Sequence, residues 1–175
     1  MAMKGSHVRR SELPFVWPTP AVRIALVEPQ IPPNTGNIAR LCAATGCSLH
    51  LVEPLGFDIS DRAVKRAGLD YWDSVDLSTH PSFNNLLKTL DPPRFFLFST
   101  AAKTSFYDQT FAAGDMLVFG SETSGLADEI LDTWPERVVG IPIRPDHVRS
   151  LNLASSVAIA AYEALRQINS NHQSS

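Results

Sequence analysis

Three short polar segments of the chain carry the residue types that could do chemistry. The first, Asn34-Thr35-Gly36-Asn37-Ile38-Ala39-Arg40, places the amide of Asn37 one helical turn before the long cation of Arg40. At about 100° per residue, these two side chains project together from one side of a helix, away from its apolar stripe. This pair can bind a polar or anionic ligand, but a capped helix start with a solvated arginine explains the segment better when it is taken alone.

The second segment, Phe119-Gly120-Ser121-Glu122-Thr123-Ser124-Gly125-Leu126, joins an apolar run to a helical pattern. Gly120 and Gly125 allow the backbone to approach a ligand closely. The segment matches neither a P-loop, nor the Rossmann dinucleotide motif, nor a nucleophile elbow. A ligand-binding turn and an ordinary strand-to-helix turn explain it about equally well.

The third segment runs from Ile141-Pro142-Ile143-Arg144-Pro145-Asp146 to Arg149-Ser150-Leu151-Asn152. Its two prolines make the chain stiff, and Ser150 or Asn152 can cap the helix that follows. Small residues in the first turn of that helix leave room for a ligand. A proline-shaped loop is the alternative, but the density of polar residues favours a binding site.

Secondary structure alternates along the chain and predicts an α/β fold with a mostly parallel sheet flanked by helices. Nearly continuous apolar runs predict strands at Val22–Val27, Leu49–Val52, Arg94–Phe98, Met116–Phe119 and Val138–Ile143. Helices are predicted from Asn34 (after Pro32 and Pro33 hold the chain extended) to Gly46, over Asp61–Ala67, after Pro81, from about Leu126, and from Asn152 to Ile168. The three segments then follow strand ends, where such sheets bind their ligands.

Length and composition limit the possible functions. The 175 residues suit a single domain over 22–168, with a flexible leader over 1–21 and a frayed polar tail over 169–175. No apolar run approaches the roughly 20 residues of a membrane span, and no secretory signal is present, so we expect a cytoplasmic protein.

Cys42 and Cys47 predict buried thiols, and the scattered histidines predict no metal site. The net charge of −3 argues against a generally basic nucleic-acid binder, so RNA contact needs a local basic patch or a dimer.

Taken together, the segments resemble one family. The matching residues are Glu28-Pro29-x-Ile31-Pro32-Pro33-Asn34-Thr35-Gly36-Asn37-Ile38-x-Arg40-Leu41-Cys42-Ala43, Arg66-Ala67-Gly68-Leu69-Asp70-Tyr71, Phe119-Gly120-x-Glu122-Thr123-x-Gly125-Leu126, Ile141-Pro142 and Arg149-Ser150-x-Asn152-Leu153. The chain resembles the SPOUT-class tRNA 2′-O-methyltransferases over about residues 22–168, and is most similar to the tRNA (cytidine(34)-2′-O)-methyltransferases. The leader has no counterpart in that pattern, and the segment Arg144–Arg149 is one residue longer.

The resemblance implies a SPOUT fold with a C-terminal deep trefoil knot, in which S-adenosylmethionine binds mostly through backbone groups. Carried over residue by residue, it implies cofactor contacts at Phe98, Gly120, Glu122, Gly125, Ile141, Ile143, Ser150, Leu151 and Asn152. It implies catalytic roles for Arg40, Ser150 and Asn152, and RNA contacts at Asn34, Asn37, Arg40, Arg66, Arg144 and Arg149. The implied partners are tRNA and a second copy of the chain in a homodimer.

The activity implied by the resemblance is methylation of the ribose 2′-hydroxyl at wobble nucleotide 34, a cytidine or modified uridine. The family gives the role of proton acceptor to the arginine that matches Arg40. A guanidinium keeps its proton far above neutral pH, so we expect Arg40 to hold a phosphate and to stabilise negative charge on the 2′-oxygen instead.

Other functions stay open at this point. One is ribose methylation at another tRNA or rRNA position, and another is a non-catalytic RNA-binding module of the same fold. A nucleotide-binding α/β protein that acts on small molecules is disfavoured, because the chain lacks phosphate-loop and dinucleotide motifs.

Overall fold

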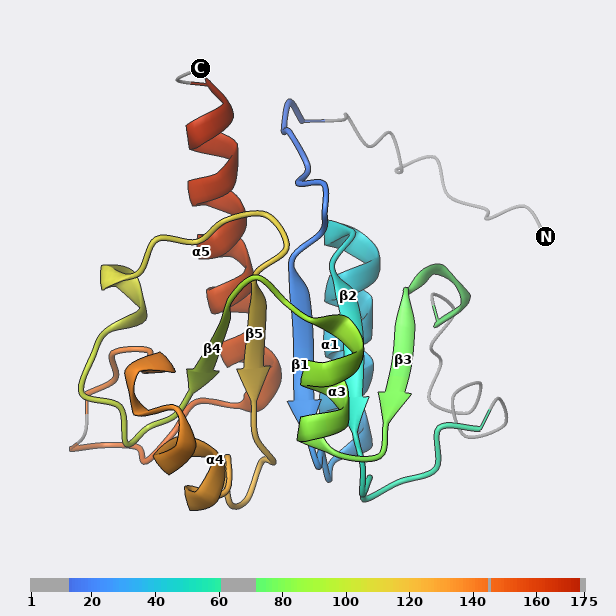
Figure 1. Ribbon diagram of the computed structural model, residues 1–175, viewed down its shortest axis with the longest axis vertical. Helices are drawn as coiled ribbons and strands as arrows, with labels where there is room; N and C mark the ends of the chain where they lie inside the picture. Colours follow the sequence, from blue (N-terminus) through green and yellow to red (C-terminus); the bar gives the residue numbers. More distant parts are fainter. Residues whose placement is uncertain (1–12, 61–71, 145, 174–175) are drawn as a thin grey trace.

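A six-stranded, all-parallel sheet forms the centre of the protein, as the computed structural model of residues 13–60, 72–144 and 146–173 shows (Figure 1). Its strands are β1 (Arg23–Val27), β2 (Ser48–Val52), β3 (Leu77–His80), β4 (Phe95–Phe98), β5 (Met116–Phe119) and β6 (Val138–Val139). Their order across the sheet is β3-β2-β1-β5-β4-β6, and each neighbouring pair runs parallel. The carboxyl ends of all strands therefore meet at one edge of the sheet, and the predicted α/β fold with a parallel sheet is confirmed.

Two strands differ from the prediction. β3 was not predicted, because its sequence Leu77-Ser78-Thr79-His80 is half-exposed at the edge of the sheet and lacks a continuous apolar run. β6 is shorter than the predicted strand Val138–Ile143. From Gly140 the chain leaves β4 and bonds to the loop after β4 instead, with Gly140 N donating to Thr104 O over 2.9 Å.

The helices are α1 (Pro32–Thr45), α3 (Phe83–Leu90), α4 (Asp128–Thr133) and α5 (Leu153–Gln173), with short 3-10 turns η1 (Trp72–Ser74), η2 (Phe106–Asp108) and η3 (Pro135–Arg137). The extended conformation predicted for Pro32 and Pro33 is wrong. Both lie in the first turn of α1, where a helix does not need their missing N–H groups. Gly46 ends α1 with a φ of 71°, as expected. The helix predicted over Asp61–Ala67 lies outside the described residues.

Both chain ends differ from the predicted leader and tail where the structure describes them. α5 continues to Gln173, beyond the predicted end at Ile168. Val16 N donates to the Asn169 side chain over 2.9 Å, and Phe15 packs against the core, so this part of the predicted leader lies on the domain.

Two layers of helices cover the sheet (Figure 1). On one face, α1 and α5 pack on residues such as Ile24, Leu49 and Leu117. On the other face, α3 and α4 pack on residues such as Ala25, Val52 and Val118. Cys42 and Cys47 are buried free thiols, as predicted. None of the described helices is long and apolar enough to cross a membrane.

Candidate active site

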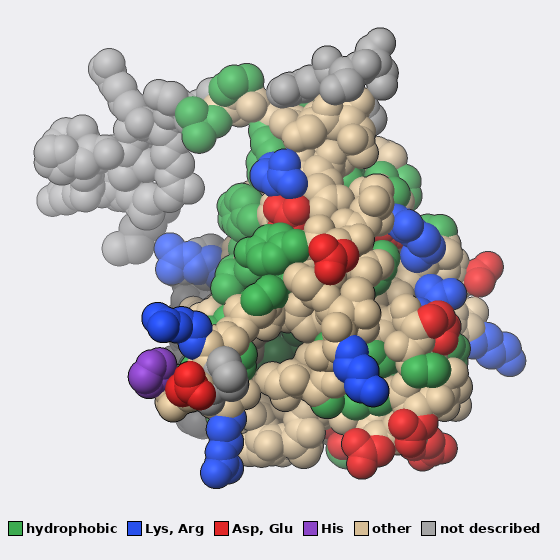
Figure 2. Space-filling view, turned by 90° about the vertical axis from the view of Figure 1, so that its left-hand side faces the viewer, with side chains coloured by type: hydrophobic (Ala, Val, Ile, Leu, Met, Phe, Trp, Pro, Cys, Tyr) green, Lys and Arg blue, Asp and Glu red, His purple; other side chains and the backbone are tan. Residues whose placement is uncertain are grey.

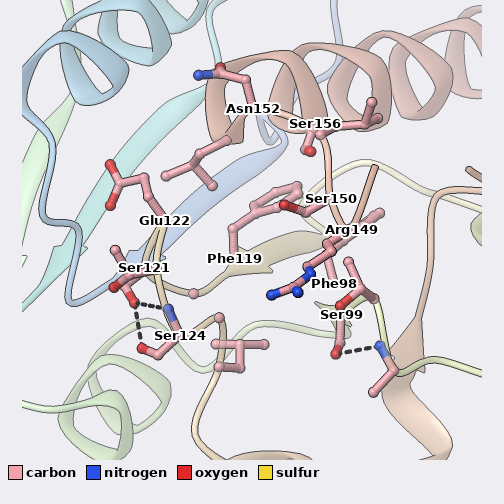
Figure 3. A pocket seen from close by; sticks show the side chains of 18 of the residues that line it. Phe98, Ser99, Phe119, Ser121, Glu122, Ser124, Arg149, Ser150, Asn152 and Ser156 are labelled. Atoms are coloured by element: carbon pink, nitrogen blue, oxygen red, sulfur yellow. Dashed lines mark hydrogen bonds between the residues drawn. The ribbon is translucent and has the colours of Figure 1, made fainter. Parts of the chain in front are cut away.

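A cavity of about 590 Å³ opens where the carboxyl ends of β4 and β5 face the start of α5 (Figure 3). We call it the cofactor cavity. Its lining includes every residue that the sequence predicted to contact the cofactor: Phe98, Gly120, Glu122, Gly125, Ile141, Ile143, Ser150, Leu151 and Asn152. Asn34 and Arg149 also line it. The fold therefore gathers residues from three distant parts of the sequence around one space.

The turn between β5 and α4 forms one wall of this cavity. Ser121 and Gly125 exchange backbone hydrogen bonds of 3.2 and 2.9 Å, and the Ser121 and Ser124 hydroxyls are 2.7 Å apart. A Cβ at Gly120 would overlap the backbone of Gly125 and Leu126. Gly125 has a φ of 69°, which favours glycine. Glycine is therefore required at position 120 because the turn packs against its own backbone there. The sequence had suggested a different reason, the close approach of a ligand.

The Glu122 carboxylate links this turn to the start of α1. It accepts hydrogen bonds from Gln30 N at 2.8 Å, from Ile31 N at 3.1 Å and from the Asn34 amide at 3.1 Å. Partial burial alone would raise the pKa of Glu122, but these hydrogen bonds and one from its own backbone outweigh it and lower the pKa. The carboxylate is therefore charged near neutral pH, and it helps to fix the loop before α1.

A second hydrogen bond extends this linkage to α5. The Asn152 amide donates to Asn34 Oδ1 over 2.9 Å, and Asn152 Oδ1 accepts from Ser155 N over 3.2 Å at the start of the helix. Asn152 is therefore the helix cap, while Ser150 precedes the helix and lies at the cavity (Figure 3). Asn34 is buried and bonded at both ends of its amide, which favours a positioning role over the predicted RNA contact.

Several predicted residues lie outside the cofactor cavity. Asn37, Arg40 and Arg144 are exposed and do not line it. Arg66 falls outside the described residues. The predicted catalytic residues Arg40, Ser150 and Asn152 are thus not brought together around this cavity within one chain.

The sequence missed other lining residues, of which Phe119 and Asp128 matter most. The rings of Phe98 and Phe119 stack with centroids 4.6 Å apart and planes inclined by 16°, which gives the cavity an aromatic wall. Phe119 ends an apolar run just as Phe98 does, and that signal could have identified it. Asp128, in the first turn of α4, gives no such signal. With Glu122 it puts two carboxylates into the lining.

The site contains no described cluster of metal ligands. Within residues 13–60, 72–144 and 146–173, no group of three or more His, Cys, Asp or Glu side chains is arranged to hold a metal ion. The site as described offers hydroxyl, amide, carboxylate, guanidinium and backbone groups to a ligand.

Comparison with known proteins identifies the family. Residues 21–162 match the model of the SpoU rRNA Methylase family. The chain belongs to this family. A relative from Burkholderia cenocepacia (strain HI2424), named tRNA (cytidine(34)-2′-O)-methyltransferase, is 49% identical over 147 residues, which cover 82% of this chain and 94% of the relative.

Solved structures agree with this assignment. One, described as giving structural insights into the 2-OH methylation of C/U34 on tRNA, is 48% identical, with a TM-score of 0.76 over 83% of this chain and 95% of that one. The SpoU methyltransferase AviRb from Streptomyces viridochromogenes, solved in complex with the cofactor AdoMet, is 24% identical. Its TM-score is 0.70, and the match covers 83% of this chain and 59% of AviRb, so this protein shares its fold.

Proposed function

We propose that this protein is a tRNA methyltransferase that transfers a methyl group from S-adenosylmethionine to the 2′-hydroxyl of nucleotide 34, a cytidine or a modified uridine. The observation that carries this proposal is the gathering of all nine predicted cofactor residues around one cavity at the carboxyl edge of the sheet. The similarity to tRNA (cytidine(34)-2′-O)-methyltransferases over nearly the whole domain supports it.

The cofactor cavity fits S-adenosylmethionine in size and charge. Its volume of about 590 Å³ lies in the range of small-molecule sites. Glu122 and Asp128 complement the cationic sulfonium and ammonium groups, and the stacked rings of Phe98 and Phe119 offer an apolar surface. When bound, the cofactor supplies an electrophilic methyl group. Ser150 and Asn152 then orient the cofactor and the ribose.

The reaction chiefly requires alignment of the 2′-hydroxyl and help with the loss of its proton. Arg40 keeps its own proton, so its proposed role is to hold the neighbouring phosphate and to stabilise negative charge on the 2′-oxygen. Arg40 is exposed on α1 and does not line the cofactor cavity of its own chain. A homodimer in which the partner subunit's Arg40 completes the site reconciles these facts.

Exposed apolar side chains are consistent with such a dimer. Ile159 and Tyr162 on α5 are 37% and 53% exposed, and Ile31 and Leu151, which line the cofactor cavity, are 42% and 36% exposed. Exposed apolar groups of this kind often mark protein interfaces. The interface would then reach the rim of the cavity.

A trefoil knot in the C-terminal part is also proposed. The chain between β4 and β5 bonds to the chain after β6, with Phe106 N donating to Gly140 O over 2.9 Å. The same connection bonds to α5, where Gln167 accepts from Phe111 N over 2.9 Å and donates to Gln109 O over 3.1 Å. This double attachment supports a connection that wraps around the C-terminal chain, although knots are rare. A cytoplasmic location is part of the same proposal and follows from the proposed tRNA substrate.

The proposed function is tested by incubating the protein with labelled S-adenosylmethionine and bulk tRNA, followed by mass spectrometry of nucleosides and of nuclease fragments, which assigns the label to a position. The expected product is 2′-O-methylation at position 34. Absence of label in RNA would contradict the methyltransferase activity. Label at another tRNA position, or in rRNA supplied in a parallel reaction, would contradict only the choice of target.

A further inference from the structure

A second cavity of about 500 Å³ lies beside the cofactor cavity, and we call it the lateral cavity. It is formed by the connection after β4 and by the chain after β6. Its polar side chains are those of Ser99, Thr100, Lys103, Thr104, Ser105 and Arg149. Arg149 lines both cavities, so the two spaces adjoin at its side chain. Figure 3 shows its guanidinium directed into the cofactor cavity.

The charged groups of the lateral cavity are all cationic. Lys103 and Arg149 line it, and none of its lining residues is acidic. The cofactor cavity, in contrast, contains Glu122 and Asp128 beside Arg149. Figure 2 shows several Lys and Arg side chains, a His and an acidic side chain near a hollow on the side of the molecule that carries these loops. The lateral cavity therefore suits an anion, and the cofactor cavity suits a ligand with positive charge.

Two hydroxyl groups in the lateral cavity can donate to an anion. Ser99 Oγ accepts a hydrogen bond from Ala101 N over 3.1 Å, and Ser105 Oγ accepts one from Tyr107 N over 3.2 Å. Because each oxygen already accepts from the backbone, its hydroxyl hydrogen is directed elsewhere. These hydrogens add neutral donors to the cation of Lys103.

The walls of the lateral cavity are fixed to one another. Ser99 N donates to Val139 O over 3.0 Å, and Gly140 N donates to Thr104 O over 2.9 Å. A Cβ at Gly140 would lie 3.1 Å from both the Ala102 side chain and the Ser99 carbonyl oxygen, so the two segments are closely packed. The backbone that carries the Ser99 and Ser105 hydroxyls is thus positioned before a ligand arrives, which lowers the entropic cost of binding.

We propose that the lateral cavity binds a backbone phosphate of the RNA substrate, with Lys103 as its cationic ligand and Arg149 between this phosphate and the cofactor cavity. This inference rests on the proposed function, because it takes the ligand of the adjoining cavity to be S-adenosylmethionine. A phosphate held there neighbours the cofactor through Arg149. It thereby fixes the register of the ribose that presents its 2′-hydroxyl, as phosphate contacts do in general.

The test compares Lys103→Ala with Lys88→Ala, a matched control at an exposed lysine in the last turn of α3. Binding of unmodified tRNA is measured by fluorescence anisotropy from low to high NaCl, and binding of S-adenosylmethionine is measured by calorimetry. Loss of one phosphate contact should weaken tRNA binding about fivefold at moderate salt and reduce the log–log salt slope by about 1. Lys103→Arg should restore both, and cofactor affinity should not change.

Two results would overturn the proposal. In the first, Lys103→Ala binds tRNA with the affinity and salt slope of Lys88→Ala. In the second, Lys103→Ala loses cofactor affinity while tRNA binding is kept, which would assign the cavity to the cofactor carboxylate. The proposed function is tested separately, by measuring methylation of tRNA with the wild-type protein. If tRNA is bound through Lys103 but is not methylated, the phosphate site is supported and the proposed function is contradicted.

Discussion

The Asn152 amide donates a 2.9 Å hydrogen bond to the side chain of Asn34, although 118 positions separate the two residues. Asn34 in turn donates to Glu122 over 3.1 Å. This chain of three side chains joins the start of α1, the turn after β5 and the start of α5. The polar groups that surround the cofactor cavity are therefore one connected unit, and a change in one member should affect the others.

Replacement of Asn34 by Ala should destabilise the protein and slow methylation. The substitution removes one hydrogen-bond donor to the Glu122 carboxylate and removes the acceptor of the Asn152 amide. These losses should lower the unfolding free energy by about 1–3 kcal/mol. The measurements are urea denaturation and single-turnover methylation at saturating RNA. Asn37→Ala is the matched control, because Asn37 is exposed on the same helix. Equal stability of the two variants would mean that the linkage contributes nothing.

A mixture of two inactive variants should regain activity if the site is shared between subunits. Arg40→Ala removes the proposed phosphate ligand, and Ser150→Trp fills the cofactor cavity. In a mixed dimer, one site combines an intact Arg40 with an intact Ser150, so random exchange should restore about a quarter of wild-type activity per subunit. Rates are measured before and after the variants are unfolded and refolded together. No recovery, with mixed dimers demonstrated by mass spectrometry, would place both residues of a site in one chain.

The two glycines of the turn after β5 should differ in what their replacement costs. Gly120→Ala forces a Cβ into the backbone of Gly125 and Leu126, so the turn must open, at a cost of about 3 kcal/mol or more. Gly125→Ala meets no atom within 4 Å, and only its positive φ opposes it, at about 1–2 kcal/mol. Thermal unfolding of both variants, with and without S-adenosylmethionine, measures the difference. Equal costs would mean that the turn readily changes shape.

A buried histidine should make the protein sensitive to mild acid. His50 on β2 lies 2.9 Å from the Ser48 hydroxyl and 2.7 Å from the Ser78 hydroxyl, which is 3.1 Å from His80 Nε2. Burial, together with the nearby His80, lowers the pKa of His50 to about 4 from an ordinary value of 6.5. The unfolded chain therefore binds a proton more readily than the folded one, and stability falls as the pH drops from 6.5 towards 4.

The loss expected from His50 is about 2–3 kcal/mol across that window. It is measured by urea denaturation at pH 7.5 and at pH 5, beside a His50→Gln variant. The variant should be less stable at pH 7.5 but should change less between the two pH values. A wild-type protein with the same unfolding free energy at both values would contradict this prediction.

Much of the fold could be predicted from local patterns. Continuous apolar runs predicted β1, β2, β4 and β5 correctly. These runs are continuous because both faces of the strands are buried. β3 could not be predicted in this way, because an edge strand with half-exposed side chains has no continuous apolar run. The end of α5 was missed because its last turns are polar and show no apolar stripe, and Asn169 in them accepts a hydrogen bond from Val16, far away in the sequence.

The sequence by itself determined which residue types belong to the site, because three polar segments follow strand ends and match one family. Only the tertiary structure decided how they work together. It buried Asn34 between Glu122 and Asn152, left Arg40 outside the cavity of its own chain, and placed Lys103 and Arg149 in the lining of one cavity. The physical reason is that hydrogen bonds and charge act over a few ångströms of space. Distances of that kind between segments far apart in the sequence are set by the packing of the sheet and its helices, and no local pattern encodes them.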